Sequence, residues 1–430
     1  MHNTDKFLFK GWEITGERDA VKFHYVLSHG KEEFVFAETL TLPKPLSVED
    51  KTHANSILDF LLLALGVSYW KTFCPKIIET PIISLSEKQT VFWNTVYTKG
   101  LGEFFYKNKI DFRGLVEFPI SSKLTPPVQT TLPDSDRSLV LLGGGKDSFV
   151  SGELVRKSGK QFSFFSLGDF PLIKEAAKST GVELITIGRQ IDPKLLELNK
   201  RSDVYNGHVP VSTLYSATAM LVALLYGFDE VVLSAEDSAD YGNVEYLGEM
   251  INHQWSKSEE AEKLLRTYFS EFVSSDITFH SLIRNFSELQ VGALFSKYPQ
   301  YFDVFSSCNK NFLLTKRAER KWCGECPKCA FVFAILAPFI PKEKLVSIFG
   351  KNLFADEKLL PIYRELLGLE AFKPFECVGT PEETKLAFLL AHQKGEYEAD
   401  IVMKQFVSLC SKEFDSIEKY QAKLLPHYDA

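Results

Sequence analysis

Residues 139–148, LVLLGGGKDS, most constrain how this chain can fold. The apolar residues 139–142 predict a buried strand, and residues 149–158 have the apolar spacing of a helix that ends at Gly159. A strand, a glycine turn and a helix N-terminus bring several backbone N–H groups to one point, where the helix dipole favours an anion. The sequence therefore predicts a cradle for nucleotide phosphates, made by Gly143, Gly144, Gly145, Lys146, Asp147 and Ser148.

The residues around this turn narrow the kind of nucleotide site. Lys146 would add a point charge to the cradle, and Asp147 could hold Mg²⁺. A P-loop requires Ser or Thr after the lysine, where this chain has Asp147, and a dinucleotide-binding turn requires glycine at the position of Ser148. The alternative to a nucleotide site is a purely structural glycine-rich turn that packs a helix against a sheet.

The stretch instead resembles the SGGxDS loop of the ATP pyrophosphatase (PP-loop) superfamily, with Gly143 in place of the usual serine. The resemblance implies that ATP is cleaved between its α- and β-phosphates and that a substrate oxygen is adenylated.

The remaining pattern predicts an α/β protein. From residue 139 onward strands and helices alternate, which is typical of a parallel sheet with both faces covered. Residues 1–45 alternate apolar and polar positions and predict an antiparallel meander, and the chain after Pro341 predicts helices. We expect an N-terminal α+β domain (1–120), a linker rich in Pro, Ser and Thr (121–138), a parallel-sheet PP-loop core (139–340) and a helical C-terminal region (341–430).

Three polar stretches are expected near the glycine turn. They are NGHVPVS (206–212), SAEDSADYGN (234–243) and INHQWSKS (251–258), which carry His208, Glu236 and His253. Ligands of such sheets bind beyond the carboxyl ends of the strands, where loops and helix starts gather. Each histidine taken singly is more readily a structural residue, and the acidic stretch could be a solvated loop. Together the three stretches predict a site.

The cysteine spacing predicts a metal centre. Cys323, Cys326 and Cys329 form two overlapping C-x-x-C units, and Cys308 lies fifteen residues upstream. Four thiolates at such spacing suit a tetrahedral, closed and therefore structural zinc site, with iron–sulfur ligation and redox chemistry as alternatives. The other cysteines, Cys74, Cys377 and Cys410, are by default buried small hydrophobes.

Composition excludes several classes of partner. The 430 residues carry a net charge of −7 without a long basic run, which argues against a nucleic-acid surface. The longest apolar runs are too short to span a bilayer, and the first residues lack a signal-peptide pattern. We expect a cytoplasmic protein that acts on a small molecule, with no nucleic-acid or membrane partner; the oligomeric state stays open.

A longer resemblance follows from ordered motifs along the chain. The chain resembles the UDP-N-acetylmuramoyl-L-alanyl-L-glutamate epimerase family in GVSYWK, GLGEFFYKN, GGGKDS, NGHVPVS, GN, NHQWSKS, FSSCN, WCGECPKCAFVFAILAPF and KPFECVG. The resemblance implies a peptidoglycan-precursor enzyme. It would use ATP and Mg²⁺ to invert the terminal L-glutamate of UDP-MurNAc-L-Ala-L-Glu to D-glutamate, releasing AMP and pyrophosphate. The four cysteines also resemble those of deazaguanine nitrile synthases, another PP-loop family that binds zinc.

The implied chemistry needs a base. Adenylation removes the negative charge of the glutamate carboxylate, so that a side chain can take the α-proton. His208, Glu236, His253 and Cys377 are the candidates. Two other functions stay open: another PP-loop adenylating ligase, such as an amide or nitrile synthase, and a non-catalytic nucleotide sensor.

Overall fold

A nine-stranded sheet forms the centre of the protein. The computed structural model describes residues 5–17, 19–122, 135–312, 320–370 and 372–425. The strands of this sheet are β1 (Lys6–Thr15), β2 (Ala20–His29), β3 (Glu32–Thr41), β4 (Ile77–Glu79), β5 (Arg137–Leu141), β6 (Gln161–Leu167), β7 (Leu184–Gln190), β8 (Glu230–Leu233) and β11 (Thr278–Ser281). They lie in the order β11-β8-β5-β6-β7-β3-β2-β1-β4, and β9 (Val244–Tyr246) pairs separately with β10 (Glu249–Ile251).

Helices cover the sheet and extend beyond it. The first part of the chain contributes α1 (Val48–Trp70), α2 (Glu87–Lys99) and α3 (Gly102–Asn108). The middle part contributes α4 (Lys146–Ser158), α5 (Pro171–Thr180), α6 (Pro193–Leu198), α7 (Val211–Tyr226), α8 (Glu259–Phe272) and α9 (Glu288–Phe295). Strands β11, β8, β5, β6 and β7 pair with one another in parallel, which confirms the expected α/β class.

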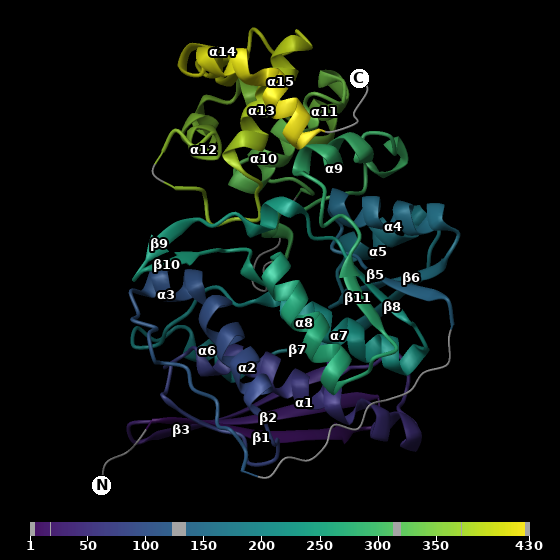
Figure 1. The fold of residues 1–430 in the computed structure, drawn as a ribbon, viewed down its shortest axis with the longest axis vertical. Coiled ribbons are helices and arrows are strands. Elements are labelled where there is room, and N and C mark those ends of the chain that lie inside the picture. The colour runs from purple at the N-terminus through teal and green to yellow at the C-terminus, as the bar shows by residue number, and fades with distance from the viewer. Residues whose placement is uncertain (1–4, 18, 123–134, 313–319, 371, 426–430) are drawn as a thin grey trace.

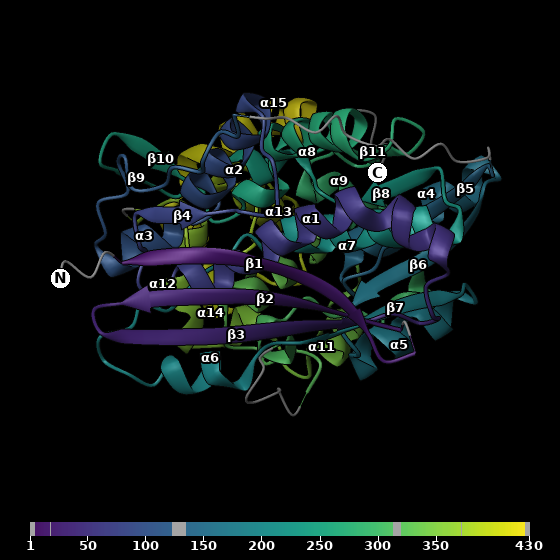
Figure 2. The same cartoon turned by 90° about the horizontal axis from the view of Figure 1, so that it is seen from below.

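The N-terminal meander continues the parallel sheet rather than forming a sheet of its own. Strands β1, β2 and β3 are antiparallel, as the alternating pattern predicted, and β3 pairs antiparallel with β7 through Thr39–Gln190 and Leu40–Arg189. Arg189 also forms a 2.6 Å ion pair with Glu38, which is fully buried. Figure 2 shows the three long strands of the meander leading into β7. The parts predicted as 1–120 and 139–340 therefore share one sheet.

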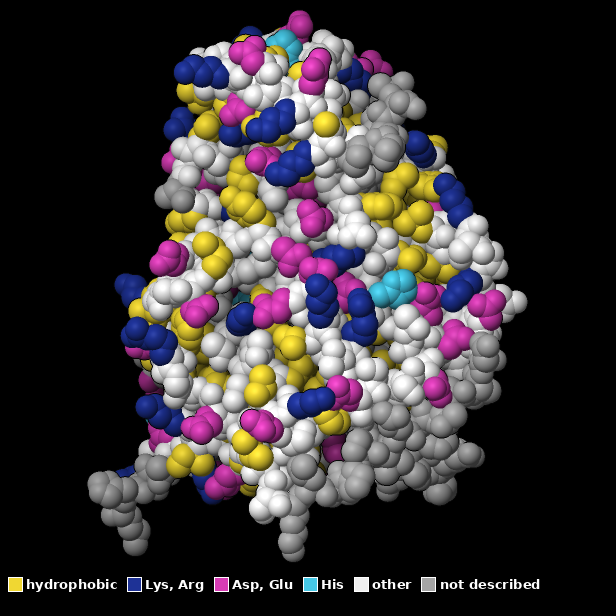
Figure 3. Space-filling model, viewed as in Figure 1, with side chains coloured by type: hydrophobic (Ala, Val, Ile, Leu, Met, Phe, Trp, Pro, Cys, Tyr) yellow, Lys and Arg dark blue, Asp and Glu magenta, His cyan; other side chains and the backbone are white. Residues whose placement is uncertain are grey.

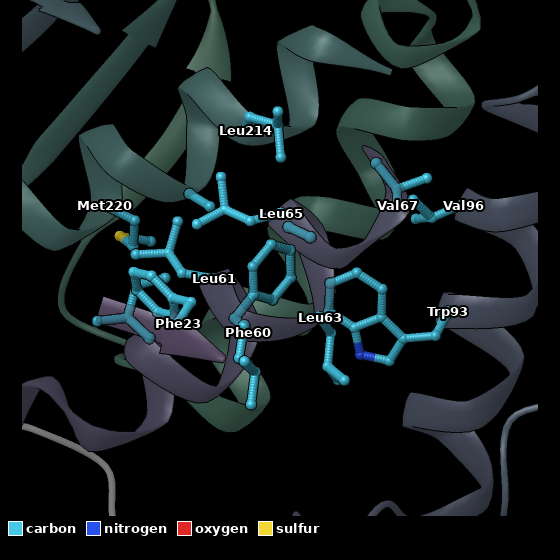
Figure 4. Packing of buried hydrophobic residues seen from close by; sticks show 14 of the residues in the cluster. Phe23, Phe60, Leu61, Leu63, Leu65, Val67, Trp93, Val96, Leu214 and Met220 are labelled. Carbon is cyan, nitrogen blue, oxygen red and sulfur yellow. The ribbon is translucent and has the colours of Figure 1, made fainter. Parts of the chain in front are cut away.

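Helix α1 packs directly on β1 and β2 and also on α7, which in turn packs on β5, β6 and β8. Apolar residues fill most positions of its second half, so every side of the helix has to be buried. Figure 4 shows Leu61 of α1 next to Phe23 of β2 and Met220 of α7, and Phe60 of α1 on the side of Trp93 of α2. The first turn of α7 borders the cavity described below. Because α1 packs on α7, the N-terminal segment helps to position that turn.

The C-terminal region is helical, as its sequence predicted. It contains α10 (Pro327–Leu336), α11 (Lys342–Phe349), α12 (Leu360–Leu366), α13 (Pro381–Gln393), α14 (Ile401–Leu409) and α15 (Ile417–Leu424). In Figure 1 these helices lie at the opposite end of the molecule from β1, β2 and β3. Of the predicted linker, residues 123–134 lie outside the described residues, and β5 begins at Arg137, two residues before the strand start expected at Leu139.

The surface is mixed in charge. On the face drawn in Figure 3, lysine and arginine side chains alternate with aspartate and glutamate over most of the described surface. None of the helices in the described part of the chain is both long and apolar enough to cross a bilayer.

Candidate functional site

The strand order places a crevice at the glycine turn. Within the parallel part, β6 and β7 follow β5 on one side, and β8 and β11 lie on its other side. The chain therefore leaves β5 and β8 in opposite directions, and ligands of open α/β sheets bind at such a reversal, beyond the carboxyl ends of the strands. The segments after β5 and β8 are the glycine turn and the SAED stretch that the sequence singled out.

The glycine turn adopts the geometry that its residues predicted. Gly144 has a φ of +79°, a left-handed conformation that favours glycine, and a Cβ there would lie 3.0 Å from Leu172 Cδ2. A Cβ on Gly143 would meet no atom within 4 Å, so this residue faces open space. Helix α4 begins directly after Gly145, and its free N–H groups point back toward the turn. An anion could approach the backbone here without a side chain in its way.

A cavity of about 270 Å³ lies at this turn. Its walls come from the ends of β5 and β8, the first turns of α4 and α7, and three loops. The lining residues are Leu141, Leu142, Gly143, Gly145, Asp147, Ser148, Val211, Ser212, Tyr215, Ser216, Leu233, Ser234, Ala235, Ser256, Lys257, Ser307, Asn309, Phe312, Lys328 and Cys377. The glycine turn and parts of all three predicted polar stretches thus share one cavity.

The charges around the cavity differ from the expectation in one respect. Lys146 is buried, and its ammonium contacts the carboxylates of Asp147 and Glu288 rather than lining the cavity. Burial lowers the pKa of Lys146, but these carboxylates outweigh it and raise the pKa, so the ammonium stays charged. Lys257 and Lys328 are the lysines that line the cavity. Lys146 therefore positions the Asp147 carboxylate from the buried side, and Lys257 and Lys328 face an anion that enters the cavity.

Glu236 belongs to the same charged cluster without lining the cavity. It lies at the end of the segment after β8 and is almost fully buried. Burial and the nearby charge of Asp147 raise the pKa of Glu236, while Lys257 opposes this shift. Because Asp147 lines the cavity, it is the better placed of the two carboxylates to hold a cation beside a nucleotide.

Cys377 lies on the opposite wall of the cavity between two cations. Its Sγ is 3.6 Å from Lys257 Nζ and 3.8 Å from His253 Nε2. Burial opposes ionisation, but the Lys257 ammonium and the hydrogen bond with His253 outweigh it and lower the pKa of Cys377 to about 5. Cys377 is only partly buried and lies between two cations, unlike the buried small hydrophobe of the default interpretation. These charges favour its thiolate form.

Glu103 joins the two predicted histidines. His253 Nδ1 donates to Glu103 Oε2, and His208 Nδ1 lies 3.3 Å from the same oxygen. Burial opposes protonation of His253, but its bonds with Cys377 and Glu103 raise its pKa to about 9. Burial and the positive charge of His253 lower the pKa of His208 to about 4. One histidine is thus charged and the other neutral at pH 7.

This trio could in principle bind a metal ion, since its ligand atoms lie within 4.8 Å of one another. Two cations already use the Glu103 carboxylate, because Lys107 Nζ lies 2.5 Å from Oε1 and charged His253 donates to Oε2. A divalent ion would have to displace one of them. Geometry and charge therefore favour a hydrogen-bonded relay over a metal site.

The four predicted metal ligands do meet in space. The Sγ atoms of Cys308, Cys323, Cys326 and Cys329 lie within 4.8 Å of one another, and Cys329 Sγ is 3.6 Å from Cys323 and 3.5 Å from Cys326. Ligands about 2.3 Å from a tetrahedral zinc would lie about 3.8 Å apart, so the four thiols fit such an ion.

The cysteine segments also contribute to the cavity. Ser307 and Asn309 flank Cys308, Lys328 lies between Cys326 and Cys329, and all three of these polar residues line the cavity. The backbone N–H of Ser306 donates to the carbonyl of Gly144 at 2.8 Å. A metal at the thiols would therefore fix one wall of the cavity against the glycine turn.

Comparison with known families adds an independent observation. Residues 1–282 match the MurL N-terminal domain, and residues 304–421 match the MurL C-terminal domain. The chain belongs to the MurL family. The resemblance that the motifs predicted is confirmed at this level, and the PP-loop ancestry of the core stays a prediction.

Curated MurL relatives extend over nearly the whole chain. The chain is 38% identical over 411 residues to the UDP-N-acetyl-alpha-D-muramoyl-L-alanyl-L-glutamate epimerase of Xanthomonas oryzae pv. oryzae (strain MAFF 311018), covering 94% of this chain and 90% of that protein. Proteins of the same name from Micromonospora sp. and Salinispora tropica are each 39% identical, with 94% of this chain and 90% and 88% of those proteins covered. Epimerases are isomerases, which confirms the expectation of an isomerase.

A larger groove of the MurL fold, about 620 Å³, lies between α2, α3 and the β9–β10 hairpin. Its charged lining residues are Lys99, Asp240, Glu249 and Glu260, and Lys99 is already paired with Glu260 at 2.6 Å. Acidic side chains repel phosphate groups, so this groove is a poor nucleotide site. The smaller cavity, which Asp147, Lys257, Lys328 and Cys377 line, is the better candidate for a nucleotide site.

Sequence reasoning assigned no role to Glu103 and Lys257, and it expected Lys328 only to offset the charge of the cysteine thiolates, not to line the cavity. Lys257 and Lys328 stand inside motifs that were singled out, INHQWSKS and CPKC, and Glu103 stands inside GLGEFFYKN. A signal for Glu103 exists only in its position within a motif of the MurL family, because it lies 105 residues from His208 and 150 from His253. No local sequence pattern indicates that Glu103 contacts His208 or His253.

Proposed function

We propose that this chain inverts the terminal L-glutamate of UDP-MurNAc-L-Ala-L-Glu to D-glutamate, using ATP and Mg²⁺ and releasing AMP and pyrophosphate. One observation carries the proposal: the glycine turn and Cys377 line the same cavity. A phosphate cradle would supply activation, and a thiolate would supply proton transfer, within reach of one bound substrate.

Activation is needed because the α-proton of a glutamate carboxylate is poorly acidic. Removing it would create a second negative charge next to the first. Adenylation of the carboxylate removes the first charge and makes the carbonyl an electron sink, so a side-chain base can take the proton. A fold that holds ATP beside a thiolate meets both requirements.

Different residues of this chain would bind the phosphates, the Mg²⁺ ion and the structural zinc. The backbone N–H groups of the glycine turn would bind phosphate oxygens, and Lys257 and Lys328 would stabilise charge on the leaving pyrophosphate. Asp147, held by Lys146, would bind the Mg²⁺ that neutralises the phosphates. Cys308, Cys323, Cys326 and Cys329 would hold a structural zinc that fixes Lys328 at the cavity.

The experiment is a turnover in deuterated water. Purified protein, ATP, Mg²⁺ and UDP-MurNAc-L-Ala-L-Glu should give AMP together with a D-glutamyl product that carries deuterium at its α-carbon, measured by chiral analysis and mass spectrometry. A product with its original α-hydrogen would exclude proton abstraction. ADP as the main nucleotide product would exclude adenylation.

Other outcomes point to the alternatives. AMP released only in the presence of an amine or ammonia donor would favour an adenylating ligase such as an amide or nitrile synthase. ATP binding without AMP release, with every donor and dipeptide precursor supplied, would favour a nucleotide sensor.

A further inference from the structure

Cys377 stands at one end of a short chain of contacts that runs through His253 and Glu103 to Lys107. Its Sγ lies 3.8 Å from His253 Nε2, and the other ring nitrogen of His253 donates to Glu103 Oε2. Lys107 binds the second oxygen of Glu103 at 2.5 Å. Each imidazole nitrogen of His253 thus faces an acceptor, which is the arrangement that favours an imidazolium.

We propose that Glu103 is a positioning residue: it holds His253 as an imidazolium against Cys377, so that Cys377 is the thiolate that removes the α-hydrogen. The assignment of α-proton removal to Cys377 rests on the function proposed above. The charge relay, meaning the contacts from Glu103 through His253 to Cys377, does not, because it is a property of the protein without substrate.

The groups that face Cys377 support this state from several elements. Lys257, from the loop after β10, lies 3.6 Å from the sulfur, and the charge of Lys328, from α10, also lowers the pKa of Cys377. Glu376 is the acid beside it in sequence, and its carboxylate is bonded to Asn309. Burial and the Cys377 charge raise the pKa of Glu376.

Glu103 is the anion that makes the relay possible. Burial opposes its ionisation, but the bond from His253 and the charges of the two histidines lower the pKa of Glu103 to about 2. His208 faces Glu103, Lys107 and Lys71, and it is neutral. Without the Glu103 charge, burial would favour neutral His253, and Cys377 would lose one of its two nearest cations.

The geometry also separates Cys377 from the other candidate bases. Glu236 and His208 are described residues that do not line the cavity, and His253 reaches it only through the sulfur. Cys377 lines the cavity itself and is partly exposed within it. A base has to lie within hydrogen-bond reach of the proton that it removes, and of the four candidates Cys377 is the one whose side chain lines the cavity.

The proton-transfer step balances with the groups present and water. The Cα–H bond breaks, the S–H bond forms on Cys377, and the electron pair passes into the activated carboxyl group. A solvent proton then adds to the opposite face of the α-carbon, and Cys377 releases its proton to water, which restores the thiolate.

The test measures the alkylation of Cys377 by iodoacetamide from pH 4 to pH 10, by mass spectrometry of the peptide that contains Cys377. Only the thiolate reacts, so the rate reports the ionisation of the sulfur. In the wild type the rate should reach half its maximum near pH 5 and stay flat through neutral pH. In Glu103→Gln the midpoint should rise by at least one pH unit, and the rate at pH 5 should fall several-fold.

A matched control is Glu79→Gln, which removes a carboxylate paired with Lys6 at 3.3 Å far from the cavity and should leave the profile unchanged. If Glu103→Gln does not fold by circular dichroism, the wild-type profile and His253→Gln carry the test. A wild-type midpoint near pH 8.5, or a Glu103→Gln profile that matches the wild type, would overturn the proposal.

Turnover in the same variants separates this inference from the proposed function. Glu103→Gln should lose inversion most strongly at the pH values where its alkylation rate has fallen, and less at higher pH. If alkylation shifts as expected but the wild type inverts no glutamate, the proposed function fails, and the assignment of the α-proton to Cys377 fails with it while the relay stands.

Discussion

The two walls of the cavity are built in opposite ways. The glycine-turn wall comes mainly from one continuous stretch, residues 141–148, in which strand, turn and helix follow one another. On the opposite wall, the Cys377 wall, Lys257 and Cys377 line the cavity, and His253, Glu103 and His208 lie behind them; these residues come from four separate segments of the chain. The first wall works through backbone N–H groups, and the second works through coupled side-chain charges.

This difference implies that the two walls should fail differently. Loss of a side chain under the glycine turn should abolish activation of the substrate. Loss of a side chain in the Cys377 wall should leave activation in place and stop only the inversion.

The largest expected effect is a separation of the two half-reactions. Asp147→Asn should lower substrate-dependent AMP release at least ~10³-fold, because the cation that neutralises the phosphates loses its carboxylate. Cys377→Ala should continue to release AMP while inversion falls ~10²- to 10⁴-fold, the usual range for a lost acid–base group. AMP release and D-glutamate formation are measured in the same reactions. Equal loss of both in both variants would mean that the two walls are not functionally distinct.

The next effect concerns the charge beneath the glycine turn. Lys146→Met removes the cation that contacts buried Glu288 and half-buried Asp147, and leaves Glu288 only Lys328 at 4.0 Å, so the free energy of unfolding should fall by about 3–5 kcal/mol. Urea denaturation measures this change. The matched control is Lys174→Met, whose pair with Asp169 is exposed, and it should change the free energy of unfolding by less than about 0.5 kcal/mol. Similar values for the two variants would show that Lys146 is not held as described.

Loss of a ligand from the cysteine cluster should have an intermediate effect on metal content and stability. Cys326→Ser should remove a bound metal, found otherwise at about one zinc per chain, and lower the melting temperature. The stability lost would be about 2.7 kcal/mol for metal present at a hundred times its Kd. Metal analysis and thermal unfolding measure both changes, and Cys410→Ser, in a buried thiol outside the cluster, is the control for metal content. A stable, metal-free wild type would contradict this prediction.

The smallest effect compares neighbouring glycines. Gly144→Ala should destabilise the protein by about 1–2 kcal/mol, because its φ is +79° and the new Cβ would lie 3.0 Å from Leu172. Gly143→Ala should leave the free energy of unfolding within about 0.5 kcal/mol, since the new Cβ enters open space. If that space holds phosphate, Gly143→Ala should still weaken ATP binding, measured by calorimetry. Unchanged ATP affinity would place the phosphates elsewhere.

The sequence by itself determined the elements and the contiguous wall. Alternating positions predicted β1, β2 and β3, and the apolar residues before the glycines predicted the strand that became β5. Short-range geometry explains this success: a glycine turn before a helix needs no distant partner to present its N–H groups. The cysteine spacing was informative for the same reason, because three of the four thiols lie within seven residues.

Only the tertiary structure decided how charges are shared. The sequence could not tell that β3 pairs with β7, so that one sheet carries both halves, nor that Lys146 is bound to Glu288 instead of facing the cavity. It also could not join Glu103 to His253 or place Lys257 beside Cys377. The ionisation of a buried group depends on which charges lie within a few ångströms, and distant segments reach that separation only after the chain has folded.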